Sequence, residues 1–317
     1  MKFSSGGSRI LAKTGQSLLT LGSVIVLVFL LVRLIPGDPV KVILGTEATP
    51  EAAAALRDQL NLDKPVPEQF LNYVVGLLRG DLGTSVIQRG IPVPEIILGA
   101  LPTTLSVVVV GMSLAAMVGI FAGMTAARTN RKEVDLGVRI WGMMLFATPT
   151  FLIGLLLILV FSVQLSWFPA GGWEASFPAV LGYLVLPGIA LSTNMAPTIA
   201  RAVRQAAVDV SGQQYMEAAV SRGIPSRALA IKHVLPNSLL PVITLMGISF
   251  GTLLTGAIIV EAVFGLPGLG AEMTKAVARR DYPVIQGIAL ISAVAVIVGN
   301  FLAELAYTLV DPRARKS

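Results

Sequence analysis

The chain alternates long apolar runs with shorter polar segments, and this pattern occurs six times along its length. A helix needs about 20 apolar residues to cross the hydrocarbon core of a bilayer. Each run is long enough for one such helix and too short for two. The pattern predicts a single transmembrane domain over residues 1–317 of an all-α membrane protein. Its six expected spans cover approximately residues 15–35, 101–127, 140–163, 179–201, 236–260 and 284–306.

The longest polar segment, residues 36–99, contains two stretches with helical periodicity of their own. The first opens with Thr49 as a candidate N-cap and Pro50 at the first helical position. The second repeats apolar residues at helical spacing, namely Phe70, Tyr73, Val74, Leu77 and Leu78. We expect two short amphipathic helices here, which form either a structural cap over the bundle or a docking surface for a substrate-delivering partner.

Composition and charge fix the class and the orientation of the chain. Hydrophobic residues make up 54% and charged residues 13%, whereas soluble proteins carry about a quarter charged residues. The net charge of +6 is scattered between apolar runs, which disfavours a nucleic-acid surface. Counted by loop, 15 Lys and Arg residues fall on the side of the termini and 8 on the other side. The positive-inside rule therefore predicts that both termini are cytosolic.

No stretch of the chain carries a recognisable catalytic motif. It contains no P-loop, no paired-histidine metal motif and no cysteine, so we expect no catalytic, cofactor-binding or metal site in this chain. Only Glu261 and Glu304 are ionisable residues near the ends of spans, and an ion-coupled carrier usually needs more of them. A transport protein energised by a partner is favoured, and an ion-coupled secondary carrier is the alternative.

The longest cytosolic segment, residues 201–233, is where a partner could supply that energy. A short helix is expected within it, opening at Ser211 or Gly212 and closed by Gly223 in a left-handed cap. A second helix restarts near Pro225 or Ser226 and leads into the fifth span. One apolar strip of the short helix, Tyr215, Met216, Ala219 and Val220, would suit either a groove on a partner or the surface of the membrane.

The same segment resembles the cytosolic loop of ABC-importer permeases. The matching positions are Glu217, Ala218, Ala219, Gly223, Leu235 and Pro236, while His233 stands where the general pattern has Ile. A histidine at this position, followed by "VLPN", resembles the loop of the dipeptide, oligopeptide and nickel subfamily. Further stretches resemble the same subfamily: "RLIPGDP" at 33–39, "RGDLGTS" at 79–85, "VEAVFGLPGLG" at 260–270 and "RDYPVIQG" at 280–287.

The resemblance implies a type I ABC-importer permease of a bacterial inner membrane. Its partners would be a second homologous permease, which we expect to form a heterodimer with this chain, two ATPase subunits that bind ATP and Mg, and an extracytoplasmic binding protein. The cargo would be a peptide, a nickel complex, glutathione or a sugar-like molecule. ATPase coupling would use Tyr215, Glu217, Ala218, Ala219, Gly223, His233, Leu235 and Pro236.

Small and hydroxylated residues in the spans suggest how the helices pack and where cargo passes. The fifth span carries Thr244, Ser249, Thr252 and Thr255, which we expect to line the translocation path. The pairs Gly119/Gly123 and Gly247/Gly251 allow close helix approach, either within this chain or against the second permease. Pro187 and Pro197 are expected to kink the fourth span.

Overall fold

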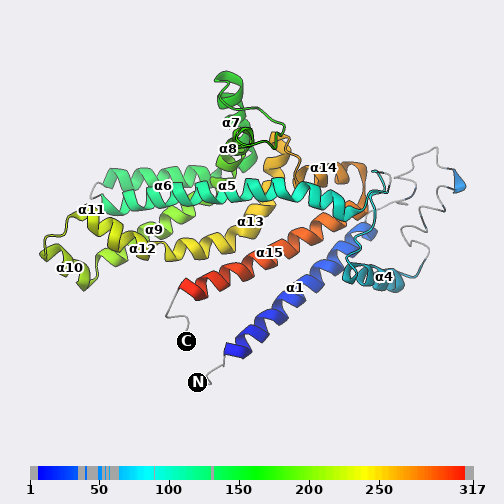
Figure 1. Cartoon of the computed structure of the whole chain (residues 1–317), viewed down its shortest axis with the longest axis horizontal. Helices are drawn as coiled ribbons and strands as arrows, with labels where there is room; N and C mark the ends of the chain where they lie inside the picture. The colour runs from blue at the N-terminus through cyan, green and yellow to red at the C-terminus, as the bar shows by residue number, and fades with distance from the viewer. Residues whose placement is uncertain are drawn as a thin grey trace. The chain divides into compact units, whose positions relative to one another are not determined.

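In the computed structural model of the chain, the described residues are built mainly of helices (Figure 1). It describes residues 6–34, 40, 49–51, 54, 57, 64–88, 90–129 and 132–310, with the backbone alone for 6–14, 31–34, 132 and 302–310. Within these residues the helices are α1 (Gly6–Leu34), α4 (Val66–Leu78), α5 (Val93–Arg128), α6 (Lys132–Ala147), α7 (Thr150–Leu157), η1 (Ile158–Gln164), α8 (Ala179–Ser192), α9 (Ala196–Ser211), α10 (Gln214–Ser221), α11 (Ser226–Leu229), η2 (Ala230–Val234), α12 (Leu235–Ser238), α13 (Leu240–Phe264), α14 (Leu269–Arg279) and α15 (Tyr282–Val310). The all-α class is confirmed.

The chain divides into two compact units. The first comprises residues 1–102 and 271–297, and the second comprises residues 103–270 and 298–317. In the first unit, α4 packs against α1 through Phe29, whose ring lies edge-on to Phe70 at 5.0 Å between centroids. The predicted amphipathic helix at 66–78 is thereby confirmed, although Leu78 is exposed. Most of the other predicted outer helix, which opens at Thr49, lies outside the described residues, as does most of 33–39.

Two subfamily stretches of the first unit meet at Asp281. The carboxylate of this buried residue accepts hydrogen bonds from the Ser85 hydroxyl and from the backbone N–H groups of Val86 and Ile87. The turn after "RGDLGTS" and the start of "RDYPVIQG" are therefore joined by one carboxylate. Three hydrogen bonds satisfy the oxygens of this buried side chain.

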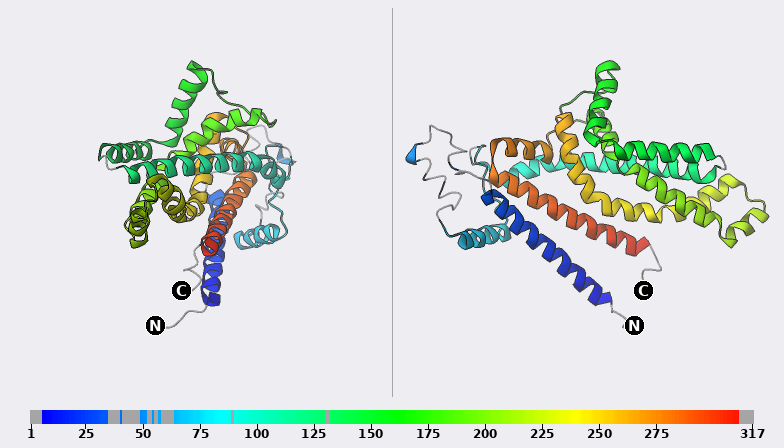
Figure 2. Two further views of the ribbon diagram at one scale, coloured as in Figure 1. Left: turned by 60° about the vertical axis from the view of Figure 1, so that its left-hand side comes forward. Right: turned by 180° about the vertical axis from the view of Figure 1, so that it is seen from behind.

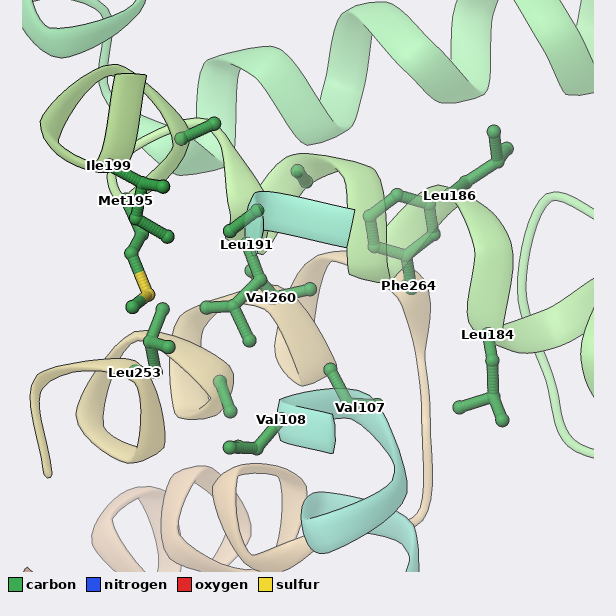
Figure 3. Packing of buried hydrophobic residues seen from close by; sticks show 14 of the residues in the cluster. Val107, Val108, Leu184, Leu186, Leu191, Met195, Ile199, Leu253, Val260 and Phe264 are labelled. Atoms are coloured by element: carbon green, nitrogen blue, oxygen red, sulfur yellow. The ribbon is translucent and has the colours of Figure 1, made fainter. Parts of the chain in front are cut away.

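The core of the second unit is apolar and draws on four helices (Figure 3). Val107 and Val108 come from α5, Leu184, Leu186 and Leu191 from α8, Ile199 from α9, and Leu253, Val260 and Phe264 from α13, while Met195 is the residue just before α9. Glycine lets α5 and α9 approach closely, because a Cβ at Gly119 would overlap Ile199 and one at Gly123 would overlap Val203. The Gly119/Gly123 pair thus packs within this chain.

Two of the expected spans are broken rather than continuous. Helices α6 and α7 meet at a bend of 101° at Thr148–Pro149, and Figure 2 shows α7 turning away from the line of α6. Helices α8 and α9 meet at a bend of 62°, just before Pro197. Proline at the start of α9 is compatible with a helix N-terminus, whereas Pro187 lies inside α8 without ending it.

These breaks affect how many spans the described residues support. Three helices are long and apolar enough to cross a membrane, over Val93–Arg128, Ser226–Phe264 and Tyr282–Phe301. If each bent pair counts as one span, the number rises to five; α1 enters this count only through Gly15–Leu30, the part of it that is described with side chains. The count of six therefore stays a prediction.

Candidate functional site

The short helix α10 carries the segment that resembles a coupling loop. It begins after Gln213, one to two residues later than the sequence suggested, because Ser211 still belongs to α9 and Gly212 caps that helix. Its end agrees with the prediction, since Gly223 has φ +76°. Gly223 N–H donates to the Val220 carbonyl at 2.9 Å.

A second hydrogen bond completes this cap. Ile224 N–H donates to the Ala219 carbonyl at 3.3 Å, and the two bonds together form a Schellman motif. Both Ile224 and Ala219 pack on the same small apolar cluster, which is the hydrophobic contact that usually accompanies the motif. The direction in which the chain leaves α10 is therefore fixed by two hydrogen bonds and a buried contact.

That apolar cluster, which we call the base cluster, attaches α10 to the long helices of the second unit. Its buried members are Ala207, Val210, Met216, Leu229 and Val234, and its half-buried members are Met124, Ala127, Ala219 and Ile224. They come from α5, α9, α10, α11 and η2 and from the residue after the α10 cap. A displacement of α10 is therefore transmitted directly to α5 and α9, whose side chains pack in the same cluster.

The outward side of α10 differs from the expected single apolar strip. Only Met216 and Ala219 of that strip face the base cluster, whereas Tyr215 and Val220 are 44% and 60% exposed. Glu217 and Ala218 are also exposed. The Glu217 carboxylate makes no ion pair with any residue in the described part of the chain. The helix therefore presents a small mixed face with one unneutralised carboxylate.

The helix that restarts at Ser226 runs on into the fifth span, as predicted, and reaches Phe264. Pro236 lies within it and lacks an N–H, and its ring would crowd the carbonyl four residues earlier in a regular α-helix. A π turn over Ala230–Val234 directly precedes it, and Leu235 N–H donates to the Ala230 carbonyl. The wider turn lets the helix continue past the proline.

The remaining two coupling candidates lie on that continuous helix. His233 and Leu235 are half-buried, and the backbone carbonyl of His233 accepts a hydrogen bond from Asn237 Nδ2 at 2.6 Å. The structure thus brings Tyr215, Glu217 and Ala218 to one exposed face. His233, Leu235 and Pro236 instead belong to the helical connection behind it.

One charged contact beside this region was missed by the sequence reasoning. Asp135 of α6 accepts from Arg204 of α9 through both oxygens, at 2.5 and 3.1 Å, and it also pairs with Arg139 at 2.8 Å. A bidentate arginine–carboxylate pair holds geometry well, so it fastens α6 to α9. In the sequence, both arginines indicate only the orientation of the chain, because no local pattern pairs them with Asp135.

The expected path residues lie mainly along one side of α13. Thr252 and Thr255 are exposed on a stripe with Ile248 and Ile259. Thr244 and Ser249 are half-buried. The Thr244 and Thr255 hydroxyls donate to carbonyls four residues earlier, at 3.3 and 3.1 Å. The exposed face of α13 is therefore less polar than its composition suggests.

Glu261 has a specific place in the turn that follows α13. It is fully buried, and one of its oxygens accepts from Gly270 N–H at 2.7 Å. The turn itself needs glycine, because Gly265 has φ +63° and a Cβ on Gly268 would overlap the Glu261 carboxyl group. The motif "VEAVFGLPGLG" therefore forms a tight turn around one carboxyl group.

We expect Glu261→Leu to destabilise the second unit, because it leaves the Gly270 N–H buried without an acceptor. The loss should be about 1–3 kcal/mol, visible as a lower thermal unfolding midpoint of the purified protein in detergent. Glu261→Gln keeps an acceptor oxygen and is the matched control, with a midpoint near that of wild type. Equal midpoints for the Leu and wild-type proteins would contradict this role.

The described residues contain no group of three or more His, Asp or Glu side chains placed to hold a metal ion. The features that stand out are the exposed face of α10, its fixed cap and its attachment to the spans. This arrangement suits mechanical contact with a partner.

Comparison with known families covers nearly the whole chain. Residues 119–316 match the family described as binding-protein-dependent transport system inner membrane component, and residues 9–108 match the N-terminal part of such membrane components. The chain is 36% identical over 313 residues to a probable peptide ABC transporter permease protein, y4tP, of Sinorhizobium fredii, covering 98% of this chain and 99% of that protein. It is 34% identical to the oligopeptide transport system permease protein AppB of Bacillus subtilis, covering 96% and 98%. It is 39% identical to the glutathione transport system permease protein GsiC of Salmonella choleraesuis, covering 93% and 95%.

A solved structure agrees at the level of the fold. The MetNI methionine ABC transporter in an inward-facing conformation has a chain that matches with a TM-score of 0.53 at 18% identity, covering 68% of this chain and 97% of that one. The family matches and the relatives extend over both units of the chain. The chain therefore belongs to the family of inner-membrane permease components of binding-protein-dependent ABC importers, in the subfamily that includes the peptide and oligopeptide permeases.

Proposed function

We propose that this permease imports di- or oligopeptides and that the exposed face of α10 docks into a groove of an ATPase subunit. The observation that carries the proposal is the construction of α10, which is exposed on one side and held on the other side by the base cluster. The peptide assignment is supported by the names of two relatives, although a third is named for glutathione, itself a small peptide.

The coupling mechanism follows from what α10 is attached to. ATP binding closes the two ATPase subunits and displaces the docked α10. Because Met216 and Ala219 are packed against α9 and the start of the helix that becomes α13, the displacement is transmitted to those helices. The Schellman cap at Gly223 keeps the angle between α10 and the following helix during this movement.

The proposed assembly sits in a bacterial inner membrane with both termini in the cytosol. It contains a second homologous permease, two ATPase subunits that hold ATP and Mg, and an extracytoplasmic binding protein. The two permeases are proposed to form a heterodimer. An ion-coupled carrier is not favoured, because Glu261 is engaged in a turn rather than facing a path.

Reconstitution tests the function directly. Proteoliposomes that contain the permeases, ATPases and binding protein should take up a labelled tripeptide only when ATP is supplied on the ATPase side. Omission of the binding protein should reduce uptake to background. Uptake driven by a proton or sodium gradient without ATP would support the carrier reading instead.

A further inference from the structure

The two broken spans of the second unit meet at their breaks. Helix α6 ends at Ala147 and α7 begins at Thr150, while α8 ends at Ser192 and α9 begins at Ala196. Between them, Asn194 Nδ2 donates to Thr150 Oγ1 at 2.7 Å. One polar side chain from each break is thus paired with one from the other.

The other hydroxyl groups at the breaks are used locally. Thr148, Ser192 and Thr193 each donate to a carbonyl three or four residues earlier in the chain, at 2.7 Å. These hydroxyl groups are thus turned back onto the backbone of their own helix. Asn194 and Thr150 are therefore the pair that is directed across the gap instead of back along its own helix.

Asn194 is also unusual in its exposure. In the stretch 190–197 it is the only exposed residue, and its seven neighbours are buried. Backbone groups freed by a helix break cost several kcal/mol each in hydrocarbon, so breaks at membrane depth occur where protein or a water-filled cavity surrounds them. An exposed asparagine at such a break indicates water rather than lipid on its outer side.

The pair has hydrogen-bonding capacity to spare. The Asn194 carbonyl oxygen, its second amide N–H and the Thr150 O–H have no partner among the described residues. An acceptor with two donors beside it complements an amide group, which offers one N–H and one C=O. The chemistry that fits is a peptide backbone in transit.

We propose that Asn194 and Thr150 line the translocation path and hydrogen-bond the backbone amides of the cargo as it passes the two helix breaks. The cargo class rests on the proposed function, whereas the position of the pair beside water does not. This placement adds a polar contact point on the third and fourth spans to the expected path residues of the fifth.

Thiol accessibility tests the position of the pair. Because the chain contains no cysteine, Asn194→Cys and Thr150→Cys each introduce a single thiol into this subunit of the reconstituted complex. A complex with the unchanged chain gives the background labelling of the other subunits, which is subtracted. A charged, membrane-impermeant thiosulfonate should modify both cysteines. The rate of modification should differ between the complex with ATP and the complex without ATP. Phe121→Cys, at an apolar α5 position that is 74% exposed, is the control and should stay unmodified. Modification of Asn194→Cys no faster than that of Phe121→Cys in both states would overturn the inference.

Cargo discrimination tests the contact. Uptake per ATP hydrolysed is compared for a tripeptide and for its N-methylated form, which lacks the amide N–H groups, with the same binding protein throughout. Asn194→Ala should reduce the preference for the unmethylated peptide about fivefold, the effect of one ordinary hydrogen bond. Asn194→Gln should retain part of the preference. If Asn194→Ala lowers uptake of both peptides equally, the pair is structural and the inference fails.

The two measurements also separate this inference from the proposed function. A wild-type complex that imports no peptide would overturn the proposed function, yet thiol labelling would still decide whether the pair faces water. An unreactive Asn194→Cys protein would overturn the inference even where wild type imports peptide normally.

Discussion

Gly223→Val should abolish most cargo-stimulated ATP hydrolysis, with a reduction of at least about tenfold. Gly223 has φ +76°, a conformation in which a β-branched residue is a severe outlier, and the strain is of the order of 1–3 kcal/mol. The chain would relieve it by opening the cap, so that α10 loses its fixed angle to the following helix. The measurement is ATPase activity of the reconstituted complex with and without loaded binding protein.

Gly212→Val is the matched control, because Gly212 lies at the other end of α10 and has φ −83°. An added Cβ there meets nothing closer than 3.8 Å. This variant should keep most of the stimulation. Assembly of the complex is measured for both variants by co-purification, which separates a lost angle from a lost subunit. Full stimulation in Gly223→Val would contradict the role of the cap.

Glu217→Lys should weaken association with the ATPase subunits by at least about tenfold. Glu217 is exposed on α10 and pairs with no described residue of its own chain, so the fold should not depend on it. In a docked complex it becomes enclosed, and reversal of an enclosed charge is strongly unfavourable. Binding of purified ATPase subunits to the permease in nanodiscs gives the affinity directly.

Asp209→Lys makes the same charge reversal on α9, at an exposed residue outside α10. It should leave ATPase affinity within about twofold of wild type. A basic-to-acidic reversal on the ATPase groove should restore binding of Glu217→Lys and not improve binding of wild type. Equal affinities for the Glu217 and Asp209 variants would show that α10 is not the docking helix.

Local rules predicted the segment around α10 well where one residue decides the geometry. The left-handed cap at Gly223 and the restart at Ser226 follow from backbone preferences of glycine and proline. The inward or outward side of α10 did not follow, because it depends on the base cluster, whose members come from five helices and one connecting residue. Periodicity alone grouped Tyr215 with Met216, and tertiary contacts then placed only Met216 inside.

The broken spans show a second limit of sequence patterns. The apolar windows at 140–163 and 179–201 predict which residues lie within the membrane. They do not predict the bends, because the residues on both sides of each bend are apolar. The break at Thr148–Pro149 has a proline as its local cause, and Pro197 marks the other break. Pro187 has the same chemistry and lies inside an unbroken α8, so proline alone does not tell which positions bend. The pairing of Asn194 with Thr150 is a contact between distant residues that no local pattern contains.

The π turn at Ala230–Val234 has an evolutionary consequence. A π turn corresponds to an α-helix with one inserted residue, and each residue in an α-helix rotates the chain by about 100°. Loss of one residue from this turn would leave both flanking helices intact and turn the side chains of α10 about the axis of the long helix. A deletion of one codon in a related transporter would therefore change the direction of the exposed face of α10 toward its ATPase subunit, while the membrane-spanning helices keep their sequence.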